Sequence, residues 1–187
     1  MNCSERRSHP CEAKNMDEPL PVFKYHPDPI ATGAIVADPD APCLSCNRIR
    51  GYIYEGPVYS EKFHHMKHTL CPWCIADGSA AKKLGAEFAD AGTMDDVDES
   101  VMQEISCRTP GFEAWQDGQW LTCCADAAAF LGAAGAAELK GKFADAIPAI
   151  EQDWDGDWHD LDKDGQPTAY VFRCLHCNQF LVYVDQA

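Results

Sequence analysis

Two short apolar runs near the end of the chain have the residue pattern of β-strands. They cover residues 170–173 and 180–184, and the second reads F-L-V-Y-V. A short polar segment, C-L-H-C-N-Q, separates the two runs and contains Cys174 and Cys177. We therefore expect a strand–turn–strand unit at the C-terminal end, with two cysteines in its turn.

Three other segments place apolar residues at the three- to four-residue spacing of an amphipathic helix. They cover residues 79–88, 95–107 and 136–151. The predicted apolar faces consist of Ala80, Leu84 and Phe88; of Val97, Val101 and Ile105; and of Leu139, Phe143, Ile147 and Ile150. We expect Pro110 to stop the second helix and Pro148 to bend the end of the third, because proline lacks the backbone donor that a helix needs.

The remaining patterned segments combine strand formers with turn signals. Residues 52–59 read Y-I-Y-E-G-P-V-Y, which predicts a short β-hairpin around the Gly-Pro turn. Residues 120–132 predict a short strand, then two adjacent cysteines, then a helical turn. The aromatic side chains of residues 112–120 are expected to fill the core rather than to form a binding platform. Helices and strands in this mixture predict an α+β fold.

The chain divides into a tail and one domain. Residues 1–18 are polar and without periodicity, which predicts a disordered tail. Residues 19–187 are expected to form one domain, with a cysteine-rich part at 19–90 and helices plus the C-terminal hairpin at 91–187. Three prolines between residues 21 and 29 favour extended chain at the start of this domain.

Cysteine pairs carry the clearest chemical signal in the sequence. Six of the 11 cysteines form three Cys-x-x-Cys pairs: Cys43 and Cys46, Cys71 and Cys74, and Cys174 and Cys177. Two intervening residues let the chain turn so that both sulfurs face one centre, and zinc prefers four such ligands in a tetrahedron. A lone pair is a weak signal, but two pairs at a hairpin-length separation are a strong one. We therefore predict a bound Zn²⁺.

The pairing of the three units is open from the sequence alone. Cys43 and Cys46 with Cys71 and Cys74 would give the order knuckle, β-hairpin, helix, which is the order of a treble-clef zinc module. Joining the first pair to Cys174 and Cys177 would instead give a zinc ribbon. We favour the first arrangement, because the linking segment is short, and we expect this treble-clef-like module to pack on a small mixed domain.

A second metal site is predicted near the C-terminal pair. The adjacent Cys123 and Cys124 come directly after the short strand predicted at residue 120, where they could meet Cys174 and Cys177. We expect Cys124 to be the third ligand, and we leave open whether Cys123 joins it. With three thiolates and one open position, such a site could activate water.

Charge and hydropathy limit the partners and the compartment. The formal net charge is −15, and each site of four thiolates and Zn²⁺ would add about −2. Such a surface repels nucleic acid and anionic lipid and attracts basic proteins. No apolar run approaches the roughly 20 residues of a membrane span, and the first residues lack the apolar core of a signal peptide. We therefore expect a cytoplasmic protein, where zinc thiolates are more common than disulfides.

Five segments together resemble the CbrC family of bacterial colicin-tolerance proteins. They are F-K-Y-H-P-D-P-I-A-T-G-A-I, R-G-Y-I-Y-E-G-P-V-Y, L-C-P-W-C-I-A-D-G-S-A-A-K-K, R-T-P-G-F-E-A-W-Q and Y-V-F-R-C-L-H-C, within residues 20–185. The resemblance implies a bacterial protein linked to tolerance of a nuclease bacteriocin, and it supplies no catalytic residues. In relatives we expect His-Cys where Cys123 and Cys124 stand, so Cys123 is either a substituted ligand or a spare thiol.

Three functions are compatible with these observations. The first is a non-catalytic, zinc-stabilised protein of bacterial stress or colicin tolerance, which meets a basic partner through its acidic surface. The second is a zinc metalloenzyme at Cys124, Cys174 and Cys177, although neither an H-E-x-x-H motif nor a zinc-deaminase motif is present. The third is a thiol redox protein acting through Cys71 and Cys74. We favour the first, with no catalytic residues.

Overall fold

The computed structural model describes residues 18–64, 66–92, 94, 96–116 and 118–186, so the predicted tail lies outside the described residues except for Glu18. The strands are β1 (Ile35–Ala37), β2 (Tyr52–Tyr54), β3 (Thr122–Cys123), β4 (Asp126–Ala127), β5 (Ala129–Ala134), β6 (Thr168–Arg173) and β7 (Phe180–Asp185). The helices are α1 (Pro72–Ala76), α2 (Ser79–Leu84), α3 (Glu99–Arg108), α4 (Ala136–Lys140) and α5 (Ile147–Asp153), with short 3₁₀ turns at Ala144–Ala146 and Trp158–Asp160. This mixture confirms the α+β prediction.

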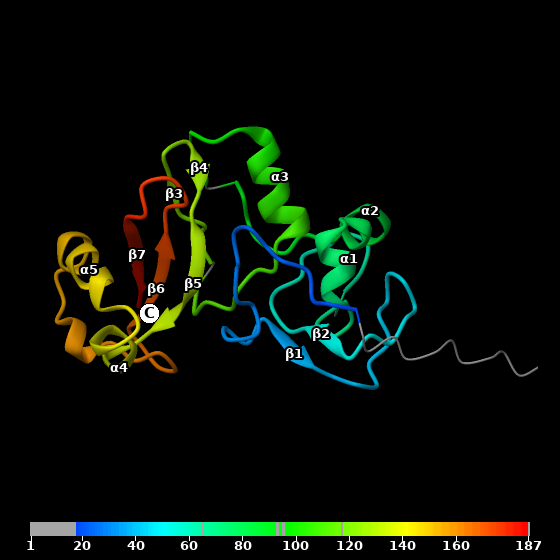
Figure 1. The fold of residues 1–187 in the computed structure, drawn as a ribbon, viewed down its shortest axis with the longest axis horizontal. Helices are drawn as coiled ribbons and strands as arrows, with labels where there is room; N and C mark the ends of the chain where they lie inside the picture. Colours follow the sequence, from blue (N-terminus) through cyan, green and yellow to red (C-terminus); the bar gives the residue numbers. More distant parts are fainter. Residues whose placement is uncertain (1–17, 65, 93, 95, 117, 187) are drawn as a thin grey trace, which may run out of the picture.

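An antiparallel sheet in the order β5-β6-β7 forms the C-terminal half (Figure 1). The C-terminal strand–turn–strand prediction is confirmed, because β6 and β7 pair from Thr168 with Asp185 to Arg173 with Phe180. Five of the six residues of β6 are buried, which follows from the cover on both faces of the sheet.

The two faces of the sheet bury different side chains. On one face, Tyr170 and Phe172 pack with Phe130 and with the aromatic segment that precedes β3. Phe112 stacks on Phe130 with ring centroids 3.9 Å apart, and Trp120 is buried beside them, so these two rings fill the core as predicted. Trp115 differs: it is 52% exposed. α3 covers this face through Ile105, which is buried as its helical spacing predicts.

α4 and α5 cover the opposite face of the sheet (Figure 1). Ala169 and Val171, which alternate with Tyr170 and Phe172 along β6, pack there against Leu139 and Ile150. The single helix predicted over residues 136–151 is wrong. α4 ends before Gly141, and Pro148 lies in the first turn of α5, where its missing N–H costs nothing.

The segment 129–134 is a strand, so the helical turn predicted there is wrong. It pairs with β6, and a bulge between Phe130 and Gly132 shifts the register. Gly132 has φ +135°, a conformation that residues with a side chain rarely adopt.

The N-terminal half contains the β1-β2 pair, α1 and α2 around a separate apolar cluster (Figure 1). The β-hairpin predicted over residues 52–59 is wrong: β2 pairs with β1, Ile35 opposite Tyr54, while Tyr59 bridges to Glu87. The fully buried Tyr54 draws the chain inward, because its hydroxyl donates to the Pro57 carbonyl and accepts from the Gly111 N–H, both at 2.9 Å.

The helix predicted over residues 79–88 is shorter than expected. Gly85, at φ +62°, ends α2 after Leu84. Phe88 is buried in the same cluster as Ala80 and Leu84 although it lies outside the helix. The proposed division at residue 90 stays a prediction. None of the described helices is long and apolar enough to cross a bilayer.

Candidate metal centre

The first cysteine cluster begins in the loop between β1 and β2. Cys43 and Cys46 form a tight knuckle in which the Cys43 N–H donates to the Arg48 carbonyl at 3.0 Å and the Asn47 N–H donates to the Cys43 carbonyl at 2.7 Å. Asn47 has φ 60°, a left-handed conformation that asparagine tolerates better than most residues. The knuckle turns both sulfurs toward the interior.

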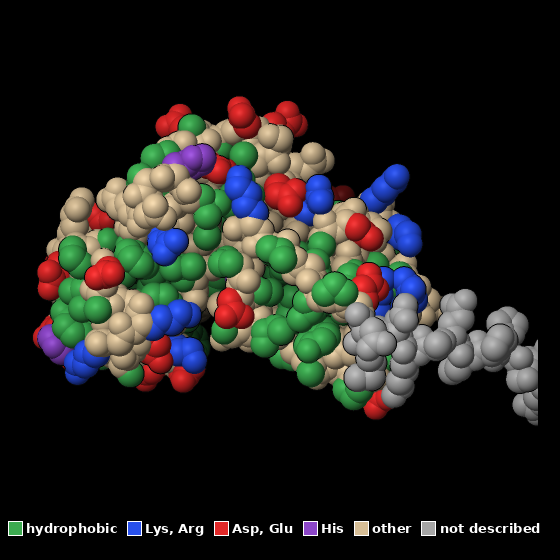
Figure 2. All heavy atoms as spheres, viewed as in Figure 1, with side chains coloured by type: hydrophobic (Ala, Val, Ile, Leu, Met, Phe, Trp, Pro, Cys, Tyr) green, Lys and Arg blue, Asp and Glu red, His purple; other side chains and the backbone are tan. Residues whose placement is uncertain are grey.

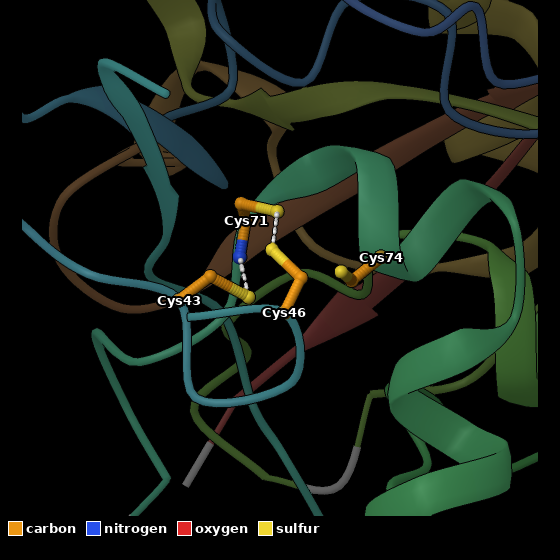
Figure 3. Close-up of side chains that lie close together, drawn as sticks. All are labelled: Cys43, Cys46, Cys71 and Cys74. Carbon is orange, nitrogen blue, oxygen red and sulfur yellow. Dashed lines mark hydrogen bonds between the residues drawn. The ribbon is translucent and has the colours of Figure 1, made fainter. Parts of the chain in front are cut away.

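The second half of this cluster lies at the start of α1 (Figure 3). Cys71 is the residue before the helix, Pro72 occupies the first turn, and Cys74 follows one turn later. The Cys71 N–H donates to the Cys43 sulfur at 3.3 Å, which links the knuckle to the helix. The sulfurs of Cys43, Cys46, Cys71 and Cys74 all lie within 4.8 Å of one another.

The spacing of the sulfurs fits one tetrahedral ion. Four thiolates at about 2.3 Å from a metal have sulfur–sulfur edges of about 3.8 Å. The Sγ atoms of Cys46 and Cys71 are 3.9 Å apart, far beyond a disulfide bond, and all four cysteines are free thiols. The residues present therefore fit a bound metal ion.

The thiols of the first cluster differ in their pKa values. Hydrogen bonds from Cys71 and Cys74 lower the pKa of Cys43 far below its usual range, whereas burial raises the pKa of Cys46 to about 11 and the hydrogen bond with Cys43 raises the pKa of Cys71. Arg50 places its guanidinium 4.0 Å from the Cys71 sulfur and stacks over Trp73. A permanent cation therefore lies beside the cluster.

The second cluster repeats the knuckle of the first. Both knuckles read C-L-x-C-N, and Asn178 has φ 62°, as Asn47 has φ 60°. The Cys174 N–H donates to the Gln179 carbonyl at 2.9 Å and the Asn178 N–H donates to the Cys174 carbonyl at 3.1 Å, which reproduces the pattern of the first knuckle. The repeat is visible in the sequence and was missed there.

The other half of the second cluster is the tight turn between β3 and β4. Cys123 pairs with Asp126, so Cys124 and Ala125 form a two-residue hairpin loop, both at φ 57°. Two consecutive positive φ values are the signature of a type I′ turn. The Cys123 sulfur lies 3.6 Å from that of Cys124 and 3.8 Å from that of Cys177, again close to a tetrahedral edge.

Backbone hydrogen bonds favour the ionised form of Cys174 in the second cluster. Burial acts to raise its pKa, but the backbone N–H groups of Cys177 and His176 lower it to about 6. These two groups lie 3.5 and 3.4 Å from the sulfur. The first cysteine of each knuckle therefore has a lowered pKa.

Asp126 anchors the turn of the second cluster. Its carboxylate accepts hydrogen bonds from the Tyr25 hydroxyl at 2.6 Å, from Lys24 at 2.9 Å and from His176 at 2.9 Å. Burial acts to raise the pKa of Asp126, but these donors outweigh it and lower the pKa to about 2. The carboxylate is therefore ionised and fully occupied in positioning its neighbours.

Comparison with known proteins places the chain in a family. A sequence model of the uncharacterised protein family UPF0167 matches residues 20–186. The chain belongs to the UPF0167 family. UPF0167 protein Mb2317 of Mycobacterium bovis is 47% identical over 95% of this chain and 100% of its own length. UPF0167 protein PA1536 of Pseudomonas aeruginosa is 44% identical over 88% of this chain and 96% of its own length. No solved structure matches the chain significantly.

In this UPF0167 chain the structure brings the predicted site residues together in two groups. Cys43, Cys46, Cys71 and Cys74 form one group; Cys124, Cys174 and Cys177 form the other, joined by Cys123. The sequence left Cys123 unassigned, because two adjacent cysteines rarely direct their sulfurs to one point unless the backbone turns as it does here. Cys107 lies in neither group. That these thiols bind an ion stays a prediction.

Proposed function

We propose that this UPF0167 chain is a non-catalytic, zinc-binding interaction protein. The observation that carries the proposal is the presence of two groups of four thiols at tetrahedral spacing. An all-thiolate, four-coordinate site is typical of structural zinc, because Zn²⁺ binds thiolates well and readily accepts a tetrahedral arrangement. In the first group, the order knuckle then helix start also fits a treble-clef module, although the hairpin between them is replaced by the β1-β2 pair.

The first cluster would contribute directly to folding. Cys43, Cys71 and Cys74 belong to the same buried cluster as Ile35, Tyr54 and other core residues. In the absence of an ion, four closely spaced thiols offer few good hydrogen bonds, whereas an ion would fasten the β1-β2 loop to α1. Metal binding and packing of the N-terminal half are therefore expected to be coupled.

The geometry supports the non-catalytic function over the two enzymatic alternatives. At the second cluster, Cys123 supplies the fourth sulfur, so the open position needed by a metalloenzyme is filled. The Asp126 carboxylate, which closes the turn that carries Cys124, already accepts three side-chain hydrogen bonds and is poorly placed to act as a base. Cys71 and Cys74 are buried among the core residues, where a substrate disulfide cannot reach them.

Charge supports a basic protein as the partner. Acidic side chains lie along the upper edge of the molecule, over α3, and at the end that carries α4, where Lys and Arg side chains lie among them (Figure 2). The net charge of −15 would accelerate association with a cationic protein and oppose contact with nucleic acid or anionic membranes. Together with the resemblance to the CbrC family, this leads us to propose a cytoplasmic protein of colicin tolerance that binds a basic nuclease toxin.

Native mass spectrometry tests the metal part of the proposal. We expect two zinc ions per chain in the full-length protein. Cys177→Ser should lower the count to one, and Cys107→Ser, which changes a thiol outside both clusters, should leave it at two. A chain that folds without any bound metal would refute zinc binding.

Titration with a basic colicin-type nuclease domain tests the partner. Binding measured by calorimetry should weaken steeply when the ionic strength rises from about 0.02 to about 0.2 M, because the Debye length shortens from about 20 Å to less than 10 Å. An equally basic, unrelated protein serves as the control for non-specific attraction. Absence of both binding and nuclease inhibition at low salt would remove this partner while leaving the zinc sites intact.

A further inference from the structure

The two cysteine clusters share a knuckle but differ in their exposure to solvent. In the first cluster, Cys43, Cys71 and Cys74 are 0, 1 and 2% exposed, and Cys46 is partly exposed. In the second, Cys124 and Cys177 are exposed and Cys123 is partly exposed, so that only Cys174 is buried. The same local motif is therefore closed in one half of the molecule and open in the other.

The surroundings of the sulfurs differ in the same way. Arg50 and Trp73 cover the first cluster, and the Cys71 N–H donates to the Cys43 sulfur. At the second cluster, backbone N–H groups reach Cys174, and among the described residues no lysine or arginine donates to a sulfur. The Cys124 sulfur lies 3.6 Å from the Cys123 sulfur and also interacts with the sulfurs of Cys174 and Cys177.

We propose that the second cluster is a ligand-exchange site, at which a small external thiol displaces Cys124 from the bound zinc and so opens the ion to transfer. This inference rests on the proposed zinc binding. In the exchange, the external thiol forms a new Zn–S bond, the Zn–S bond of Cys124 breaks, and the proton of the incoming thiol moves to the Cys124 sulfur. Zinc stays divalent and nothing is oxidised or reduced.

Cys124 is the ligand best placed to leave. It is a central residue of the two-residue turn, whereas Cys174 and Cys177 are held by the backbone hydrogen bonds of their knuckle. Three sulfurs remain to hold the ion when Cys124 leaves, and the fourth position then accepts the external sulfur.

Zinc release to a chromogenic chelator tests the proposal on the zinc-loaded, full-length protein. We expect one of the two ions to be released about tenfold or more faster than the other, with a rate that rises with the concentration of added glutathione. The slow ion should not respond to glutathione. Two ions released at one common rate, or a fast phase that ignores the thiol, would overturn the exchange site.

Alkylation identifies the ligand that leaves, without any substitution. Brief treatment with N-ethylmaleimide in excess over the added glutathione, followed by peptide mass spectrometry, should label Cys124 first among the eight clustered cysteines and Cys43, Cys71 and Cys74 last. Earlier labelling of Cys174 or of the first cluster would contradict the assignment. Cys107→Ser serves as the control variant and should keep both release phases. A protein without zinc would refute the proposed function, whereas two zinc ions with equal release rates would refute this inference alone.

Discussion

Acidification tests the environment of His26, which is fully buried with its ring edge-on to Phe130. Its Nδ1 lies 2.7 Å from the Pro110 carbonyl oxygen and its Nε2 lies 2.7 Å from the Thr32 hydroxyl. In a neutral ring Nδ1–H donates to Pro110, and the Thr32 hydroxyl, which also lies 3.2 Å from the Pro29 carbonyl oxygen, turns its proton to the closer Nε2. Burial lowers the pKa of His26 from 6.5 to about 4, although the Pro110 carbonyl and Asp28 act in the opposite direction.

The sign of the pH effect follows from this lowered pKa. Between pH 6.5 and about pH 4 the unfolded chain binds a proton that the folded chain does not. Stability from the neutral ring is therefore complete above the unfolded pKa and is lost as the pH falls toward the folded pKa. The full effect is about 3 kcal/mol, and about 1 kcal/mol of it is lost between about pH 7.5 and 5.5.

Urea unfolding of the wild type and of His26→Gln measures this effect. His26→Gln should be less stable near neutral pH by about 1–3 kcal/mol, because the partners of the ring lose it. The difference in unfolding free energy between the two proteins should then shrink by about 1 kcal/mol as the pH falls to about 5.5. Zinc content is measured at each pH, so that metal loss, which affects both proteins, is separated from the histidine effect.

The exposed His64 provides the matched control for this experiment. His64→Gln removes one histidine from the surface and should follow the pH dependence of the wild type. If His26→Gln also follows it, with a constant difference in unfolding free energy, the folded chain does not hold His26 neutral and the reasoning fails.

Three further predictions concern packing and metal. Gly111→Ala should destabilise the chain by about 3 kcal/mol or more in urea unfolding, because the added Cβ would lie 1.8 Å from the Phe88 carbonyl oxygen. Gly118→Ala is the control: its Cβ would lie 3.4 Å from the Phe112 ring, and the variant should be almost as stable as the wild type. Leu139→Ala should cost about 2–5 kcal/mol by the same measurement, because it leaves a cavity under α4; a cost below about 1 kcal/mol would show that the site is not packed as described. Removal of metal with a strong chelator should lower the melting temperature and increase amide exchange in β1 and α1 more than in β6, and uniform change would contradict a local role for the first cluster.

Sequence patterns correctly predicted strands whose side chains alternate between two buried faces. They failed where a strand pairs with a segment far away in the sequence. β6 and β7 were predictable because their β-branched and aromatic residues favour strands. β5 reads A-F-L-G-A-A, and alanine favours helix, so its strand conformation comes from pairing with β6 rather than from its own composition. Likewise, residues 52–54 pair with the distant β1 because Tyr54 must be buried, which no local turn signal reveals.

The candidate sites were predictable to a similar extent. The Cys-x-x-Cys spacing indicated six of the eight clustered sulfurs, since two intervening residues suffice for the turn that brings a pair together. The adjacent Cys123 and Cys124 converge only because Cys124 and Ala125 both adopt a left-handed conformation, for which neither residue type has a preference. The repeated C-L-x-C-N motif was the available signal that two knuckles of one geometry were present.

Charge explains why one copy of the knuckle is buried and the other is open. A site of four thiolates and one divalent ion carries about −2, and burying such a charge is costly unless a cation lies beside it. Arg50 supplies this cation at the first cluster, with its Nη1 4.0 Å from the Cys71 sulfur. The Nη2 atom of the same guanidinium forms an ion pair with Glu18 at 2.9 Å. Among the described residues, no such cation contacts a sulfur of the second cluster, so water must solvate that charge.

Arg50→Gln should therefore make the first cluster behave more like the second. In the chelator assay, we expect the slow zinc to be released about tenfold faster, while the fast zinc keeps its rate, because a loss of about 1.4 kcal/mol of stabilisation is enough for that change. Arg48→Gln removes the same charge from an exposed position two residues away, where the side chain donates to no sulfur of the described cysteines, and should leave both rates unchanged. Equal slow rates in Arg50→Gln and Arg48→Gln would mean that burial alone, and not the guanidinium, keeps the first ion in place.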